Sequence, residues 1–279
     1  MAQLTGFLLK KNRNSMYRIK ILLIIIMQVT LLISCSSTAK FSDDAEIQNS
    51  IKTAVNNYNS DNWEIRLKSI RSVSKYSDSI YAKNSILLVI KALDDSHSTI
   101  RIEALKILRK IKAPAAEEKI RTIALTDMNS NARYYAFTAL GEYRNISNET
   151  AFIKGLESRD WLVREAALTG LMGINDPEIQ FKYIDIILNA MKDKNISIKL
   201  ACISNLTIKD PLIYSELSNI INNKKSSLYL LKAALKQIKG YKIDDKTKSR
   251  VISLLTHRDK EVRILSLQAL KMEEIIIPL

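Results

Sequence analysis

The segment Val163-Arg164-Glu165-Ala166-Ala167-Leu168 decides the fold, because its pattern returns along most of the chain. A basic residue stands after an apolar one and is followed three positions later by a small residue and four positions later by another apolar residue. The position of Arg164, here called the anchor position, recurs every 31–35 residues. It is occupied by Arg66, Arg101, Arg133, Arg164, Lys199, Leu231 and Arg263. A period sustained over so much of the chain indicates a repeat array.

Each repeat reads as two helices joined by a polar turn. Apolar runs at 86–93, 120–125, 179–191 and 213–221 predict first helices, and the anchor segments predict second helices. The turns carry Asp, Asn or Ser, whose side chains accept hydrogen bonds from the first amides of the following helix. Pro177 and Pro211 each follow an aspartate, where proline suits the first turn of a helix. We therefore expect helical hairpins that bury their apolar faces against one another.

These segments resemble the HEAT family, in particular the subclass found in phycobilisome lyases. The stretches 95–141 and 158–173 are closest to that pattern, and Ala139-Leu140-Gly141 matches its end. The resemblance implies an all-α, right-handed α-solenoid of about seven stacked helix-turn-helix repeats over residues 44–279. It also implies that anchor arginines pair with turn aspartates, here Asp61, Asp95, Asp127, Asp160, Asp193 and Asp259. Lys199 and Leu231 depart from the pattern, so we expect less regular stacking in the later repeats.

The small residue after each anchor predicts where helices approach closely. It is Ser69, Ala104, Ala136, Ala167, Cys202, Ala234 or Ser266. We expect all seven to be buried, with the apolar residues beside them filling the space between repeats.

The amino terminus has the layout of an export signal. Five basic residues and no acidic ones precede residue 35, and an apolar run from 21 to 33 ends at Ser34-Cys35. Such a run gives a helix of roughly 20 Å, short of the ~30 Å hydrocarbon core of a bilayer. Leu32-Ile33-Ser34-Cys35 resembles the bacterial lipobox, which implies a signal peptide over 1–34, lipidation of Cys35 and a polar tether over 35–43. Met16 is an alternative start to Met1.

The chain carries a net charge of +14, from 43 basic and 29 acidic residues. Without the first 34 residues, 38 basic residues face 29 acidic ones, a net charge of +9. This sign favours acidic partners, although a solvated basic surface is the simpler explanation. Candidate partner-binding residues on the predicted second helices are Lys68, Arg71, Lys106, Arg109, Lys110 and Tyr135.

The sequence contains few candidate catalytic residues. The two histidines, His97 and His257, lie in turns of repeats far apart in the predicted stack, so they are not expected to share a metal or a dyad. Neither a phosphate-binding glycine loop nor a zinc-spaced cysteine cluster occurs. Cys202 stands on an apolar helix and is expected to be a small core residue. We predict no catalytic residue, no cofactor and no metal.

The sequence therefore predicts a non-catalytic, lipid-anchored scaffold that binds protein partners at a bacterial envelope, on its periplasmic or external side. Two alternatives stay open: an enzyme accessory or lyase-like HEAT protein, and a nucleic-acid-binding HEAT-like protein with a basic groove. Export argues against nucleic acid. The apolar end Ile275-Ile276-Ile277-Pro278-Leu279 is either a docking edge or a cover for the last helix pair.

Overall fold

The computed structural model describes residues 45–76, 82–176 and 178–271. Every regular element in these ranges is a helix, which confirms the all-α prediction. None of these helices is both long and apolar enough to cross a bilayer. The predicted signal peptide, Cys35, the tether, Pro177 and the apolar end at 275–279 lie outside the described residues.

The chain divides into two compact units between Ser85 and Ile86. In the first unit, residues 45–57 form a helix that is followed by α2 (Trp63–Ser74). Ile51, Ala54 and Ile70 are among its buried residues. The second unit begins within α3 (Ala82–Lys91) and contains the remaining helices.

The α-helices of the second unit follow one another as pairs. They are α4 (Ser98–Ile111), α5 (Glu117–Thr126), α6 (Ser130–Tyr143), α7 (Glu149–Gly155), α8 (Trp161–Met172), α9 (Ile179–Lys182), α10 (Ile184–Met191), α11 (Ile196–Ser204), α12 (Pro211–Asn222), α13 (Leu228–Gln237), α14 (Asp245–Ser253) and α15 (Lys260–Lys271). Short 3₁₀ helices adjoin some of them: η1 (Ala92–Asp94), η2 (Pro114–Ala116), η3 (Ile146–Asn148) and η4 (Leu254–Thr256).

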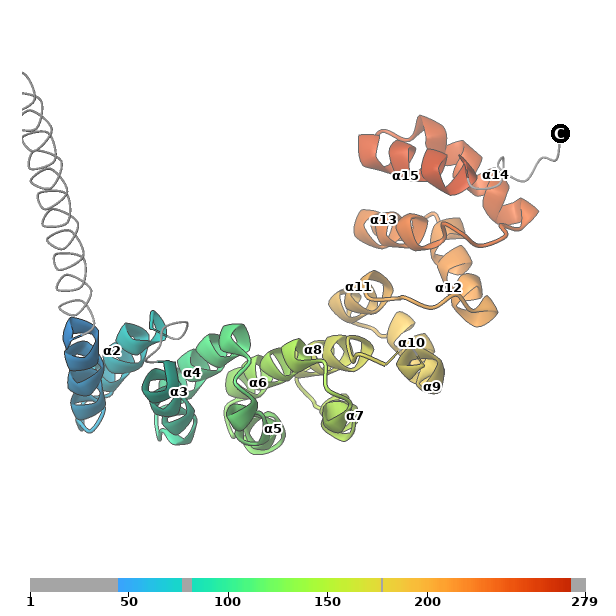
Figure 1. Cartoon of the computed structure of the whole chain (residues 1–279). Coiled ribbons are helices and arrows are strands. Elements are labelled where there is room, and N and C mark those ends of the chain that lie inside the picture. The colour runs from blue at the N-terminus through green and yellow to red at the C-terminus, as the bar shows by residue number, and fades with distance from the viewer. Residues whose placement is uncertain (1–44, 77–81, 177, 272–279) are drawn as a thin grey trace, which may run out of the picture. The chain divides into compact units, whose positions relative to one another are not determined.

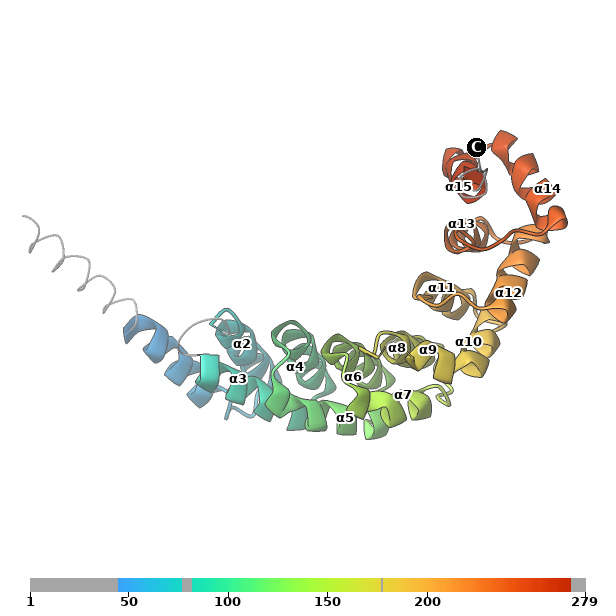
Figure 2. The same ribbon diagram turned by 45° about the vertical axis from the view of Figure 1, so that its right-hand side comes forward.

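Within the second unit the helices form two layers. The second helices α4, α6, α8, α11, α13 and α15 pack in sequence, each against the next, and form one layer (Figures 1 and 2). In the other layer, α5 contacts α7, α10 contacts α12 and α12 contacts α14. Five first helices also pack on the second helix that follows them: α5 on α6, α7 on α8, α10 on α11, α12 on α13 and α14 on α15. This stacking of helical hairpins is that of an α-solenoid, as the repeat period predicted.

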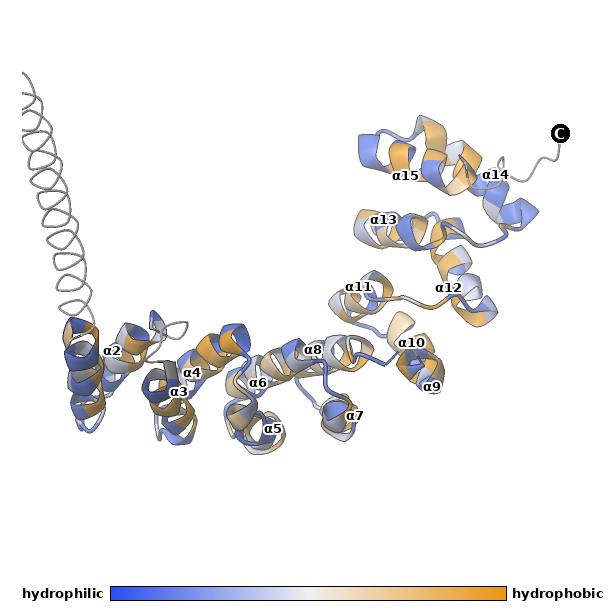
Figure 3. Cartoon of the chain, viewed as in Figure 1, coloured by the Kyte–Doolittle hydropathy of each residue, from blue (hydrophilic) through white to orange (hydrophobic). Residues whose placement is uncertain are grey.

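The small residues after the anchors lie in the core, as predicted. Ala104, Ala136, Ala167, Cys202, Ala234 and Ser266 are fully buried, and Ser69 is 4% exposed. Figure 3 shows that hydrophobic and hydrophilic residues both occur along the helices of the second unit. Their large apolar neighbours are buried too, except Ile65 and Leu267, which are 39% and 46% exposed. Ile65 stands in the first described helix pair, and Leu267 stands in the last one.

Side-chain caps begin most of the second helices. Asn62, Asn129, Asp160, Asn195 and Ser227 each accept a hydrogen bond from an amide in the first turn of α2, α6, α8, α11 and α13. Asp210 does the same for α12, which has Pro211 at its first position, as predicted. The polar turns therefore have a structural role that the sequence indicated.

The first helix predicted over 179–191 is divided in two. Tyr183 leaves the helical conformation, with φ −114° and ψ 32°, and separates α9 from α10. Just before the break, the buried Gln180 donates from Nε2 to the carbonyls of Met172 (3.2 Å) and Asn205 (2.8 Å). Its Oε1 accepts the amide of Thr207 at 2.9 Å. A buried amide must satisfy its polar atoms, and these bonds hold α9 against the end of α8 and the loop that follows α11.

Candidate functional site

The anchor arginines share a contact with the turn that precedes their helix. In each, Nη1 donates to two backbone carbonyls, five and six residues earlier in the chain. For Arg101 the acceptors are Asp95 and Ser96, and for Arg164 they are Ser158 and Arg159. Arg66, Arg133 and Arg263 repeat this arrangement. The anchor arginines therefore close the turn between the two helices of their own repeat, a role that the sequence analysis did not foresee.

Arg101 also bridges two repeats. Its Nε and Nη2 donate to the two carboxylate oxygens of Asp127 at 2.7 and 2.8 Å. Burial would raise the pKa of Asp127, but hydrogen bonds from Arg101 and from the Asn129 amide outweigh it and leave the pKa below its usual value. This is the predicted pairing of an anchor with a turn aspartate of the next repeat. It fixes the relative position of two neighbouring turns.

Other aspartates that were predicted to pair with anchor arginines instead accept backbone amides of their own turns or pair with a lysine. The Asp160 carboxylate caps α8, and that of Asp193 accepts the Asn195 amide at 2.6 Å. Asp259 forms an ion pair with Lys232 at 2.9 Å. The pairing prediction was wrong for Asp259 because a lysine on the preceding second helix reaches this carboxylate.

The candidate residues on α4 and α6 form one surface, here called the α4–α6 patch: Lys106, Arg109, Lys110 and Tyr135. The Nζ of Lys106 lies 4.7 Å from the centroid of the half-buried Tyr135 ring, a cation–π distance. Arg109 pairs with Glu142 at 3.0 Å, while Lys110 is exposed and forms no ion pair among the described residues. The structure thus brings these four predicted residues onto two adjacent helices.

Lys68 and Arg71 lie in the first unit, where both are exposed on α2. Lys68 lines a cavity of about 760 Å³ between the helix at 45–57 and α2, together with Ile65 and Tyr76.

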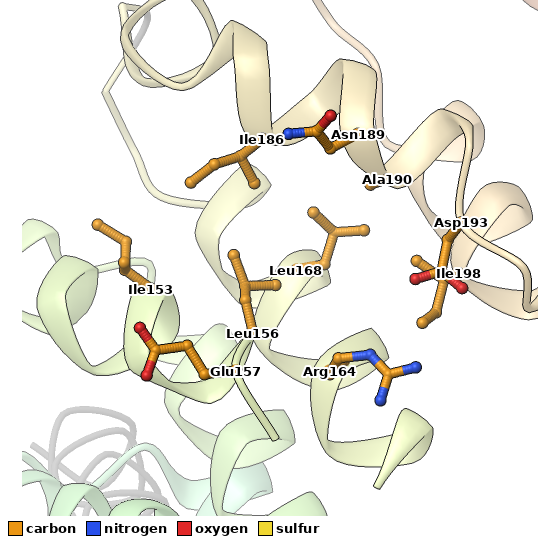
Figure 4. A pocket seen from close by; sticks show the side chains of 10 residues that line it. All are labelled: Ile153, Leu156, Glu157, Arg164, Leu168, Ile186, Asn189, Ala190, Asp193 and Ile198. Atoms are coloured by element: carbon orange, nitrogen blue, oxygen red, sulfur yellow. The ribbon is translucent and has the colours of Figure 1, made fainter. Parts of the chain in front are cut away.

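A second candidate site is a pocket of about 340 Å³ in the second unit. Its lining comes from α7 and the turn after it, from α8, from α10 and from α11. Figure 4 shows Leu156, Leu168 and Ile186 pointing into the cavity. Arg164 and Asp193 lie toward one end of it in this view, and Glu157 toward the other. The sequence analysis missed this pocket because it depends on the spacing of α7 and α10, which no residue pattern specifies.

The Cys202 thiol and the His257 ring make contacts within the fold. Burial raises the pKa of the Cys202 thiol to about 12, and its Sγ lies 3.5 Å from the carbonyl oxygen of Ile187. The Nδ1 of His257 accepts the Asp259 amide at 3.0 Å. Among the described residues, no group of three or more His, Cys, Asp or Glu side chains is placed to hold a metal ion.

No protein-family model and no curated protein matches this sequence. Solved structures are similar at low identity. The Escherichia coli protein YibA has a TM-score of 0.53 and 13% identity, over 83% of this chain and 96% of YibA. A HEAT-like repeats protein of Thermococcus onnurineus has a TM-score of 0.52 and 14% identity, over 83% and 98% of the two chains. A structure of the CpcE–CpcF complex of phycocyanin lyase from Nostoc has a TM-score of 0.49 and 17% identity, over 80% and 94%. The first two likenesses confirm that the fold is a HEAT-like α-solenoid.

Proposed function

We propose that this chain is a non-catalytic scaffold that binds an acidic protein partner through the α4–α6 patch, and that acylated Cys35 holds it at a bacterial envelope. The single observation that carries the binding role is the cluster of Lys106, Arg109, Lys110 and Tyr135 on two adjacent second helices. An α-solenoid presents such surfaces on successive repeats, so affinity builds up from several contacts.

The geometry of the α4–α6 patch suits a protein contact. Stacking on Tyr135 restricts Lys106 before binding, which lowers the entropy cost of ordering a long side chain. The Arg109–Glu142 pair is exposed, so it stabilises the fold by only about 0–1 kcal/mol and can be exchanged for a partner carboxylate. Tyrosine and arginine are also the residue types most often found at the energetic centre of interfaces.

Lipidation supplies the second half of the proposed function. Two acyl chains on Cys35 would hold the chain on a membrane where a single chain exchanges, because each buried methylene contributes about 0.8 kcal/mol. Confinement to a surface raises the local concentration of scaffold and partner, so modest contacts suffice. Radioactive or clickable palmitate should label the wild type and not a Cys35→Ala variant. Equal labelling of the two would refute this anchor.

The binding role is tested by charge reversal. Lys106→Glu, Arg109→Glu and Lys110→Glu are combined and compared with a control that reverses the exposed Lys154, Lys224 and Lys246, which lie away from the second helices. Both variants change the net charge equally. We expect proteins recovered with the wild type from nuclease-treated envelope to be lost with the α4–α6 variant and kept with the control. Equal recovery of partner proteins with the wild type, the α4–α6 variant and the control would refute a binding role for the patch. If the wild type recovers these proteins from untreated envelope but not from nuclease-treated envelope, the result would favour nucleic acid as the partner.

A further inference from the structure

The Arg101–Asp127 pair shows how an anchor arginine of this chain binds a carboxylate. Nη1 of Arg101 is fixed by the carbonyls of Asp95 (2.8 Å) and Ser96 (3.1 Å). The other edge of the guanidinium, formed by Nε and Nη2, donates to both carboxylate oxygens of Asp127. Such a two-point contact is the strongest geometry that arginine offers to a carboxylate.

Arg164 repeats the contact with the preceding turn. Its Nη1 is fixed by the carbonyls of Ser158 (2.9 Å) and Arg159 (3.1 Å), almost as in Arg101. Asp193 corresponds to Asp127, because each lies two residues before a capping asparagine and accepts that residue's amide. Yet in the part of the chain that the structure describes, neither a hydrogen bond nor an ion pair joins Arg164 to Asp193.

Arg164 lines an apolar pocket. Arg164 and Asp193 both line the cavity of about 340 Å³, whose volume is at the lower end of the range for small-molecule sites. The side chains of Leu156, Leu168 and Ile186 point into it, and Asn189 adds an amide (Figure 4). The pocket therefore combines an aliphatic lining with a guanidinium whose Nε and Nη2 bind no carboxylate of the described residues.

We propose that this pocket binds a small aliphatic carboxylate, a ligand class separate from the protein partner of the α4–α6 patch. The carboxylate takes the position on Arg164 that Asp127 takes on Arg101, and the hydrocarbon chain lies on Leu156, Leu168 and Ile186. Asp193 and Glu157 oppose the ligand charge, so they limit affinity and favour ligands whose second end is uncharged.

Octanoate is the probe for this proposal, titrated into the full chain and followed by the methyl NMR signals of leucine and isoleucine. We expect saturable shifts from octanoate and at least about tenfold weaker binding of neutral octanamide, because a charge-assisted hydrogen bond is lost. Hexanoate should bind about fifteenfold more weakly than octanoate, at about fourfold for each methylene. Equal binding of octanoate and octanamide, or no saturable shift with octanoate, overturns the proposal.

Three variants separate the pocket from general effects of charge. Arg164→Gln should weaken octanoate binding by about tenfold. Arg133→Gln removes the same kind of turn contact from an arginine outside the pocket and should leave the affinity unchanged. Equal weakening by these two variants contradicts the proposal.

The third variant, Asp193→Asn, removes an opposing charge and should tighten binding several-fold. A gain in affinity does not follow from loss of fold, so this variant decides the question even if Arg164→Gln unfolds. An unchanged or weaker affinity in Asp193→Asn overturns the assignment of Arg164 as the carboxylate ligand. Reversal of the α4–α6 patch should leave octanoate binding intact, which keeps this test independent of the proposed protein partner.

Discussion

Replacing Gly170 by alanine tests how closely α7 and α8, the two helices of one repeat, pack. Gly170 lies on α8, and a Cβ added there would stand 2.2 Å from Cε1 and 2.6 Å from Cζ of Phe152, a fully buried ring. The Phe152 ring also packs on Phe137, with 6.1 Å between ring centroids. Phe137 cannot retreat freely, because it in turn fills the space beside Gly155, where a Cβ would lie 2.5 Å from its Cζ.

Two effects of opposite sign decide the outcome of Gly170→Ala. Alanine is favoured over glycine in a helix by about 1 kcal/mol. Carbon atoms in contact normally lie about 3.5–4 Å apart, so the overlap with Phe152 exceeds 1 Å, and overpacking of a core typically costs about 1–3 kcal/mol. The overlap places the cost toward the upper end. We expect a net loss of about 1–2 kcal/mol in the free energy of unfolding, or roughly 2–8 °C in melting temperature.

Thermal and urea unfolding, followed by circular dichroism, measure this loss. Asn131→Ala is the control, because Asn131 is exposed on α6 and the change should stabilise the chain by a few tenths of a kcal/mol. Combining Gly170→Ala with Phe152→Leu should cost less than the sum of the single changes, since the smaller side chain makes room. A Gly170→Ala variant as stable as the wild type would show that α8 and α7 do not pack this closely.

Three further predictions concern titratable groups of the second unit. Asp127→Asn should destabilise the fold at pH 7. Because the folded pKa of Asp127 is lowered, the difference from wild type in urea-unfolding titrations should begin to shrink below about pH 4 and be lost as pH falls through the folded pKa. Burial raises the pKa of Glu165, so Glu165→Gln should raise the melting temperature at pH 7 and not at pH 3; a lower value at pH 7 contradicts this. In a Cys35→Ala chain, a thiol reagent at pH 8 should modify Cys202 only after urea is added, because burial raises its pKa to about 12; rapid native modification contradicts it.

The sequence predicted the repeat fold because the fold depends on side-chain size at regular spacing. Ala104, Ala136 and Ala167 recur where helices approach, and only small residues allow that approach. Ile65 and Leu267, in the first and last described helix pairs, are the exceptions to the predicted burial. A pattern of sizes can therefore be read without coordinates.

The parts that sequence reasoning missed depend on backbone geometry. The anchor arginines donate to backbone carbonyl oxygens of their turns. Because every residue carries a carbonyl oxygen, the residue types in the turn do not predict which ones act as acceptors. The break at Tyr183 lies inside an apolar run that reads as one helix. The pocket beside Arg164 depends on the distance between α7 and α10, which is a property of stacking. The α4–α6 patch was predictable because its residues lie at helical spacing within two neighbouring repeats.

Site-specific photo-crosslinking tests the proposed scaffold role most directly. A photoreactive amino acid is placed at Lys110 in the α4–α6 patch, or at Lys154 on α7 in the other layer, and irradiated in intact cells. The account predicts a discrete crosslinked protein from position 110 that disappears when Lys106 and Arg109 are reversed, and no such product from position 154. The same products from both positions, or none from position 110, would contradict it.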